Sequence, residues 1–184
     1  MGDIVDIPPG TALGIFVNQN PAASGNALMD VFSSMDADTV IGTNALSETE
    51  FRVRFARTGR IVTNSYHVAY WGLLSGRQVA LIGYSSKFSS LFDLFQISDN
   101  INQYERGDGN GLAAAIARAL TGRSFSCLPS PDEVKMEFRK MNISYAKKLV
   151  SSGIFRKINI LEDNKKQKRI REIEIWSKYF LKRD

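Results

Sequence analysis

The chain has few of the residues from which many catalytic and metal centres are built. Its 184 residues include one cysteine, Cys127, and one histidine, His67. A lone cysteine excludes an internal disulfide framework and a cysteine-rich metal site. A Cys–His nucleophile pair would need these two residues to meet, and their spacing does not support it. We therefore expect no metal or cofactor, and a reducing, cytoplasmic environment.

Long apolar runs are also missing. Gly, Arg or Gln interrupts each apolar stretch well before 18 residues, so the sequence predicts no transmembrane helix. The opening MGDIVDIPPG has an acidic start and no apolar stretch of signal-peptide length, which predicts no secretion signal. The sequence also lacks GxGxxG, GxxxxGK[ST], HExxH and GxSxG, so common dinucleotide, P-loop, zinc-protease and hydrolase motifs are excluded.

Positive charge is concentrated in the C-terminal part. The formal net charge is +5, but residues 135–184 hold 15 basic and 6 acidic residues, so the body of the chain is acidic. Such a tail suits an acidic partner or a membrane surface, here as peripheral contact at the inner membrane, and a solvated helical face explains it equally simply. Nucleic acid is the weaker partner, because Trp176, Tyr179 and Phe180 lie on or beside an apolar stripe that suits packing.

Short apolar runs alternate with helical spacing through residue 127. The runs rich in β-branched and aliphatic residues predict strands over 12–17, 38–43, 60–63, 77–83 and 100–104. This alternation predicts a single α/β, Rossmann-like domain over residues 1–127, with a mostly parallel sheet of about five strands flanked by helices.

The helices between those strands have their own signals. Ser47 and Glu50 form a capping box that opens a helix, which is expected to run through about Arg57 and to stop at Gly59. Apolar spacing predicts further helices, over 25–35, from Ser65 to Gly76, from Ser86 to Phe95 and over 111–122.

Residues 128–184 read as a basic helical extension. Ser130 and Pro131 are typical of an N-cap and a first helical position. The apolar residues that follow at helical spacing should dock on an apolar surface; they are Val134, Phe138, Met141, Tyr145 and Leu149. A second amphipathic helix is expected over 162–181.

The first loop of chemical interest follows the predicted strand 60–63 and holds Asn64, Ser65, Tyr66 and His67. A helix that begins near Ser65 points its free N–H groups and the positive end of its dipole at this loop, which favours an anion. His67 in the first turn could donate a hydrogen bond to that anion or act as a general acid or base. An ordinary helix start, with Asn64 or Ser65 as the cap and His67 half-buried, explains the same residues.

The second loop follows the predicted strand 77–83 and holds Tyr84, Ser85, Ser86 and Lys87. The serine hydroxyls and the N–H groups after them could hold a phosphate, and Lys87 supplies a compact positive charge. A capping serine before an exposed lysine is the plainer interpretation. Because consecutive strands are expected to be neighbours, both loops should face one crevice beyond the carboxyl ends of the strands.

The stretch IVTNSYHVAYWGLLSGRQVALIGYSSKF, residues 61–88, resembles the polysaccharide pyruvyl transferase family. The shared features are a strand, a Ser-x-His turn, an apolar helix ending LLxGxxV, and a strand that leads to a Ser- and Lys-bearing loop. The resemblance implies one half of a two-Rossmann-domain enzyme, the C-terminal half that binds the donor. It also implies that His67 and its neighbours face phosphoenolpyruvate, whose pyruvyl group becomes a ketal on a saccharide acceptor in bacterial surface-polysaccharide synthesis.

The chain departs from the family pattern at two positions. The family has Arg directly before the motif histidine and Gly or Ala directly after it, where this chain has Tyr66 and Val68. Without that arginine, a glycosyltransferase that uses a nucleotide-sugar donor stays open. So does a non-catalytic interaction module that docks a partner or a membrane through its basic C-terminal helices. The length implies one Rossmann-like half, so the acceptor-binding half is expected to be missing, separate, or supplied by another protein.

Overall fold

The computed structural model describes residues 3–18, 26–97, 101–121 and 123–152. The chain divides into two compact units, Met1–Lys135 and Met136–Asp184. The helix expected over 162–181 lies outside the described residues. Among the described helices, none combines the length and the apolar character needed to cross a membrane.

The first unit contains a five-stranded sheet in which every strand pairing is parallel. Its strands are β1 (Ala12–Val17), β2 (Val40–Thr43), β3 (Thr58–Thr63), β4 (Gln78–Gly83) and β5 (Asn102–Gln103). Their order across the sheet is β2-β1-β3-β4-β5. The chain therefore first adds a strand on one side of β1 and then adds all later strands on the other side. This confirms the Rossmann-like α/β domain with about five strands.

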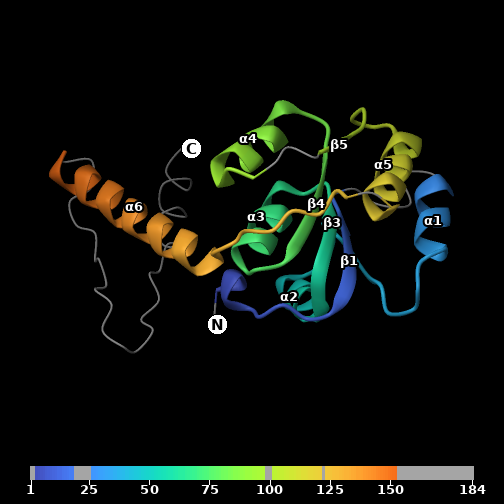
Figure 1. Cartoon of the computed structure of the whole chain (residues 1–184), viewed down its shortest axis with the longest axis horizontal. Helices are drawn as coiled ribbons and strands as arrows, with labels where there is room; N and C mark the ends of the chain where they lie inside the picture. Colours follow the sequence, from blue (N-terminus) through green and yellow to red (C-terminus); the bar gives the residue numbers. More distant parts are fainter. Residues whose placement is uncertain (1–2, 19–25, 98–100, 122, 153–184) are drawn as a thin grey trace, which may run out of the picture. The chain divides into compact units, whose positions relative to one another are not determined.

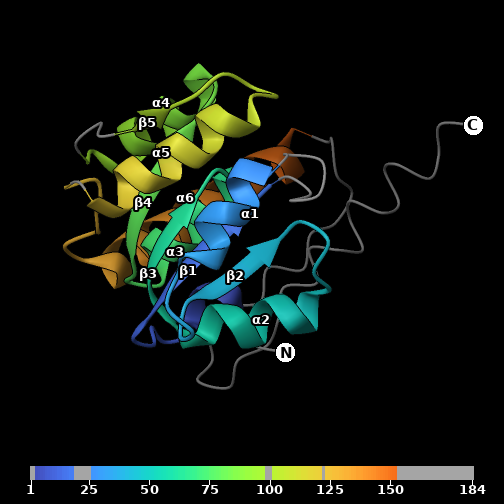
Figure 2. The same cartoon turned by 90° about the vertical axis from the view of Figure 1, so that its right-hand side faces the viewer.

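Helices cover both faces of this sheet. After a 3-10 turn, η1 (Ile4–Asp6), these helices are α1 (Asn26–Ser33), α2 (Glu48–Arg57), α3 (Tyr66–Leu74), α4 (Ser86–Phe95) and α5 (Gly109–Thr121). A further helix, α6 (Pro131–Ser151), follows them in the chain. Helices α1 and α5 pack together on one face, and α2, α3 and α4 lie on the other (Figure 1). Figure 2 shows α1 and α5 side by side in front of the central strands.

One strand start differs from its prediction. The helix that follows Ser47 ends at Arg57, as predicted, whereas the strand expected from residue 60 begins at Thr58 and includes Gly59. The strand begins directly after the helix because Thr58 already pairs with Ala12 of β1. The capping box at the start of this helix is present as predicted, with Ser47 Oγ accepting from the Glu50 N–H and the Glu50 carboxylate accepting from the Ser47 N–H.

The core has two parts because side chains alternate between the faces of the central strands. On the face of α1 and α5, aliphatic residues of β1, β3 and β4 pack against helix residues; the buried members are Ile15, Val17, Val62, Ala80 and Ile82 with Leu28, Leu112, Ala115, Ile116 and Ala119. On the other face, Phe16, Phe51, Phe55 and Trp71 form a chain of ring contacts with centroids 5.2 to 6.4 Å apart. Both faces are therefore sealed, as parallel sheets require.

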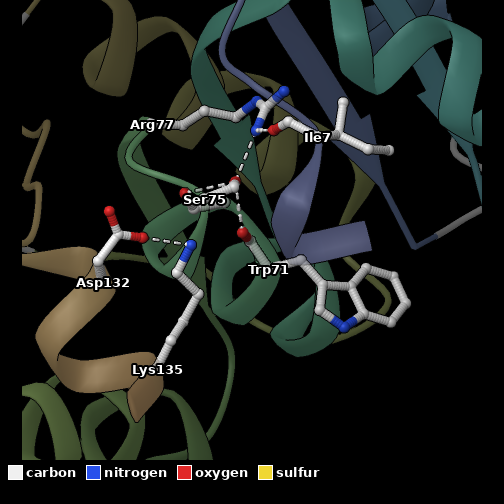
Figure 3. Close-up of polar contacts among 7 residues, drawn as sticks. Ile7, Trp71, Ser75, Arg77, Asp132 and Lys135 are labelled. Atoms are coloured by element: carbon white, nitrogen blue, oxygen red, sulfur yellow. Dashed lines mark hydrogen bonds and ion pairs between the residues drawn. The ribbon is translucent and has the colours of Figure 1, made fainter. Parts of the chain in front are cut away.

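The amino ends of the strands are joined by a buried arginine, Arg77, which is 0% exposed. Its guanidinium donates to the carbonyl oxygens of Ile7, Pro8, Phe55 and Thr58 at 2.9–3.0 Å. It also donates to Ser75 Oγ at 2.6 Å (Figure 3) and lies 3.9 Å over the Phe55 ring. Burial lowers the pKa of Arg77 to about 10. Neutral oxygens thus satisfy this cation, and it fastens the N-terminal segment to the sheet.

Local backbone geometry places Arg77 at this position. Gly76 ends α3 with φ +80, a left-handed conformation that glycine adopts without a Cβ clash. The next N–H, that of Arg77, donates to the Gly72 carbonyl at 2.9 Å. Gly72 also lets α3 lie close to the sheet, since a Cβ there would be 2.8 Å from the Val79 side chain.

Helix α6 begins as the sequence predicts and crosses the boundary between the two units. Lys135 Nζ lies 2.6 Å from Asp132 Oδ1 in its first turns (Figure 3). Two members of its predicted apolar stripe, Met141 and Tyr145, are 60% and 64% exposed. The docking expected for this stripe therefore stays a prediction.

Candidate functional site

A pocket opens at the carboxyl end of the sheet, beyond the last residues of β1, β3 and β4. Its volume is about 470 Å³, within the range of small-molecule sites. It lies where the strand order reverses, since β2 and β3 flank β1 on opposite sides. In open α/β sheets, ligands bind in a crevice at such a reversal, which here lies between the loops that follow β1 and β3. The lining residues are Asn18, Asn64, Ser65, Tyr66, His67, Tyr84, Ser85, Lys87, Phe88 and Arg106.

Both loops singled out from the sequence meet in this pocket. Of the eight residues predicted for the site, seven line it, and Ser86 does not. They meet because β3 and β4 are parallel neighbours, with Thr63 opposite Leu81, so that their following loops emerge side by side. The geometry brings the residues together, and their roles toward a ligand remain a prediction.

The sequence analysis missed three lining residues: Asn18, Phe88 and Arg106. Asn18 directly follows β1, so the rule that ligands bind beyond strand carboxyl ends would have pointed to it. Arg106 follows β5, a strand of two residues that gave only a weak signal. Its place in the pocket depends on that strand pairing with β4 at Ile82 and Gly83.

Two helices begin at the pocket without a side-chain cap. Ser65 and Ser85 occupy the N-cap positions of α3 and α4, and neither hydroxyl caps its helix. The first N–H groups of a helix have no partner within the helix, and they carry the positive end of its dipole. The structure therefore presents two open helix N-termini to one pocket, an arrangement that favours an anion.

Asn64 is the buried centre of the pocket wall, only 1% exposed. Its Oδ1 accepts from the Asn18 N–H at 2.6 Å, and its Nδ2 donates to the Tyr104 hydroxyl at 2.9 Å. One amide thus connects the loop after β1 to the segment after β5. Asn64 therefore holds the pocket wall together, and the anion-binding role predicted for it stays a prediction.

Thr63 supports the same wall from within the sheet. Its buried hydroxyl donates to the Phe16 carbonyl at 2.6 Å and accepts from the Ser65 N–H at 3.0 Å. The Thr63 hydroxyl therefore fixes the turn between β3 and α3, because it bonds both to β1 and to the N-cap residue of α3. A fixed turn gives the first N–H groups of α3 a defined direction.

His67 is exposed at the start of α3, so it is not the half-buried residue of the plainer interpretation. Its ring lies 5.9 Å from the Tyr66 ring and 5.8 Å from the Trp71 ring, measured between centroids. These contacts orient the imidazole while leaving it open to solvent. An accessible imidazole beside two helix N-termini can exchange a proton with a bound molecule.

Two cations line the pocket, and each lies over an aromatic ring. Lys87 Nζ is 4.7 Å from the centre of the Tyr66 ring, and the Arg106 guanidinium is 5.6 Å from the centre of the Tyr84 ring. Within the described ranges, neither Lys87 nor Arg106 forms an ion pair with a carboxylate. The pocket thus has positive charge available for an anion.

The Tyr104 hydroxyl is the last member of the hydrogen-bond network that joins Asn18, Asn64 and Tyr104 in the pocket wall. Burial raises its pKa, against the smaller opposing effect of the hydrogen bond from Asn64. The hydroxyl therefore stays protonated at neutral pH and serves as the acceptor that Asn64 needs. In the part of the chain that the structure describes, no group of three or more His, Cys, Asp or Glu side chains is placed to hold a metal ion.

The pocket therefore combines open helix N-termini, two unpaired cations and an accessible imidazole at the strand-order reversal. Comparisons with protein-family models, curated proteins and solved structures found no match for this chain.

Proposed function

We propose that the chain is the donor-binding half of a polysaccharide pyruvyl transferase-like enzyme, which transfers a pyruvyl group from phosphoenolpyruvate to a saccharide in bacterial surface-polysaccharide synthesis. The observation that supports this is the convergence of Ser65 to His67 with Tyr84, Ser85 and Lys87 in one pocket. These residues belong to the stretch, residues 61–88, on which the family resemblance rests. A phosphate-bearing donor fits what the pocket offers chemically.

The proposed roles follow from what each group can do. The N–H groups that open α3 and α4, together with Lys87, bind the phosphate of the donor. His67 exchanges protons with the donor and the acceptor, because it is the one imidazole of the chain and is open to solvent. Asn64 holds the loop after β1 and the segment after β5 in place at the donor site through its bonds to Asn18 and Tyr104.

His67 is proposed to carry the proton to and from the reacting atoms. Its imidazolium protonates C3 of phosphoenolpyruvate, and a saccharide hydroxyl adds to C2 while its proton passes to the imidazole, which restores the imidazolium. Phosphate then leaves with the electrons of its C2–O bond, and a second hydroxyl adds to C2 while its proton passes to the departing phosphate. The products are a pyruvate ketal and inorganic phosphate. The open helix N-termini stabilise the charge that grows on the leaving phosphate.

A nucleotide-sugar donor is the second candidate, and the aromatic lining of the pocket favours it. Tyr66, Tyr84 and Phe88 all line the pocket, and aromatic side chains can stack on a base. Tyr66 also stands where the family pattern has arginine. In this alternative, the diphosphate lies at the helix N-termini and phosphoenolpyruvate does not bind.

A thermal-shift panel on the full chain separates these candidates. The ligands are phosphoenolpyruvate, uridine and guanosine diphosphates, and their sugar conjugates, each tested with wild type and His67→Ala. A ligand at about 100 times its dissociation constant adds about 2.7 kcal/mol of stability, which gives a readable shift. Because His67 is exposed, His67→Ala should change the stability of the unliganded chain by less than about 0.5 kcal/mol.

The pyruvyl proposal predicts stabilisation by phosphoenolpyruvate that His67→Ala reduces. Stabilisation by a nucleotide alone would favour the glycosyltransferase instead. If no ligand shifts the transition, the donor site is not formed in this chain. The non-catalytic interaction module would then become the better explanation.

A further inference from the structure

Arg106 is the one pocket residue with a guanidinium, and it comes from a part of the chain that the proposed roles do not use. It follows β5, whereas the helix N-termini and Lys87 follow β3 and β4. Its guanidinium lies 5.6 Å over the Tyr84 ring, and Tyr84 in turn meets the Tyr104 ring edge-on at 5.7 Å. Tyr104 is held by Asn64. The ring pair thus ties the Arg106 loop to the wall of the pocket.

The two pocket cations differ in what they recognise. Lysine is a point charge, which joins the helix N–H groups around a phosphate without a preferred direction. The planar guanidinium of arginine fits the two oxygens of a carboxylate or of a second phosphate with paired hydrogen bonds. Lys87 and Arg106 lie over different rings, Tyr66 and Tyr84, on two successive strand-to-helix loops. A single phosphate held by the helix N-termini and Lys87 leaves Arg106 without a partner.

We infer that the pocket takes a ligand with two separate anionic groups, and that Arg106 binds the second group while the helix N-termini and Lys87 bind the first. This inference rests on the anion site of the proposed function and adds the ligand class. Phosphoenolpyruvate, with a phosphate and a carboxylate, belongs to this class, and so does a nucleoside diphosphate. The volume of about 470 Å³ accommodates such small ligands.

Calorimetric titration of the full chain tests the inference with four probes. Phosphoenolpyruvate and uridine diphosphate carry two anionic groups, whereas inorganic phosphate and pyruvate carry one each. The variants are Arg106→Gln, which removes the positive charge, and Arg106→Lys, which keeps the charge but lacks the planar guanidinium and its paired donors. Arg123→Gln is the matched control, because Arg123 is exposed and lies outside the pocket.

Arg106→Gln should weaken a two-anion ligand about tenfold or more, since it removes charge-assisted hydrogen bonds. It should leave the affinity for inorganic phosphate within about twofold, because the helix N-termini and Lys87 remain. Arg106→Lys should recover only part of the loss. Arg123→Gln should match wild type with every probe.

The results also separate this inference from the proposed function. Binding of phosphoenolpyruvate that Arg106→Gln leaves unchanged would overturn the inference and keep the pyruvyl proposal. Equal weakening of phosphoenolpyruvate and inorganic phosphate would overturn it as well, since Arg106 would then act on the first group. Arg106-dependent binding of uridine diphosphate without phosphoenolpyruvate binding would keep the inference and remove the pyruvyl proposal. If none of the four probes binds, both fail.

Discussion

The two ends of the sheet use positive charge in opposite ways. At the amino end, Arg77 is fully buried, and its guanidinium donates to four carbonyl oxygens and to Ser75 Oγ. At the carboxyl end, Lys87 and Arg106 are exposed, and each lies over the face of an aromatic ring. A buried cation whose N–H donors are already used stabilises the fold and has no donor free for a ligand. An exposed cation with unused donors adds little to stability and is free to bind.

The helix N-termini at the carboxyl end repeat this contrast. Helix α2 is closed by a capping box, in which Ser47 and Glu50 satisfy each other's backbone N–H groups. Helices α3 and α4 begin at the pocket, and their N-cap serines make no such bond. Closed and open helix starts therefore occur in one domain, and the open starts of α3 and α4 line the pocket.

The largest expected effect is on stability at the amino end. Arg77→Met should destabilise the fold by about 3 kcal/mol or more, because it leaves several buried carbonyl oxygens without donors. Urea unfolding measures the change. The exposed Arg123→Met is the matched control and should change stability by less than about 0.5 kcal/mol. A small effect at Arg77 would break the contrast between the two ends.

The second prediction concerns the pocket wall. Tyr104→Phe keeps the ring against Tyr84 and removes the oxygen that accepts from Asn64 Nδ2. Because the buried amide then lacks a partner, we expect a loss of about 1 to 2 kcal/mol in urea unfolding. Ligand affinity should fall too, as Asn64 also holds the Asn18 backbone.

Tyr84→Phe is the control for this change. It keeps the ring under Arg106 and removes a hydroxyl that Asn64 does not use. Unchanged stability in Tyr104→Phe would show that the Asn64 network does not hold the pocket together.

The smallest expected effect concerns Glu50 in the capping box that closes the start of α2. The hydrogen bond from the Ser47 side chain, and then that from the Ser47 backbone, lower the pKa of Glu50 below its ordinary 4.5. A lowered pKa in the folded state contributes stability that is present above about pH 4.5 and is lost as the pH falls through the folded value. Glu50→Gln should therefore flatten the acid side of the stability curve, measured by thermal unfolding between about pH 2 and 6.

Glu105→Gln provides the comparison, since it removes an exposed carboxylate outside any cap. It should leave the shape of the acid side as in wild type. If both variants flatten the curve equally, the capping box is not the cause.

The fold was largely predictable because local signals and the sheet agree. β1 and α4 occupy the predicted residues, and the capping box at Ser47 fixes the start of α2. The end of α2 at Arg57 was also predicted, but the strand expected from residue 60 begins at Thr58, because Thr58 pairs with Ala12 of β1. Tertiary pairing, which no local pattern carries, extends this strand past Gly59.

The candidate site was predictable where it followed strong strands. Tyr66, His67 and Lys87 reach the pocket from β3 and β4, whose apolar runs identify them plainly. Arg106 was missed because β5 has two residues and forms only against β4. The buried role of Asn64 depends on Tyr104, forty positions away, so spacing alone could not reveal it.

The central claim is that the carboxyl end of the sheet binds an anion and the amino end does not. The most direct measurement is a titration of the labelled full chain with phosphoenolpyruvate, followed by amide chemical shifts in nuclear magnetic resonance. We predict that the largest shifts belong to Tyr66 and His67 at the start of α3 and to Ser86 and Lys87 at the start of α4, with Arg77 unchanged. Shifts that cluster around Arg77 or on α6, or no shifts at saturating ligand, would contradict the claim.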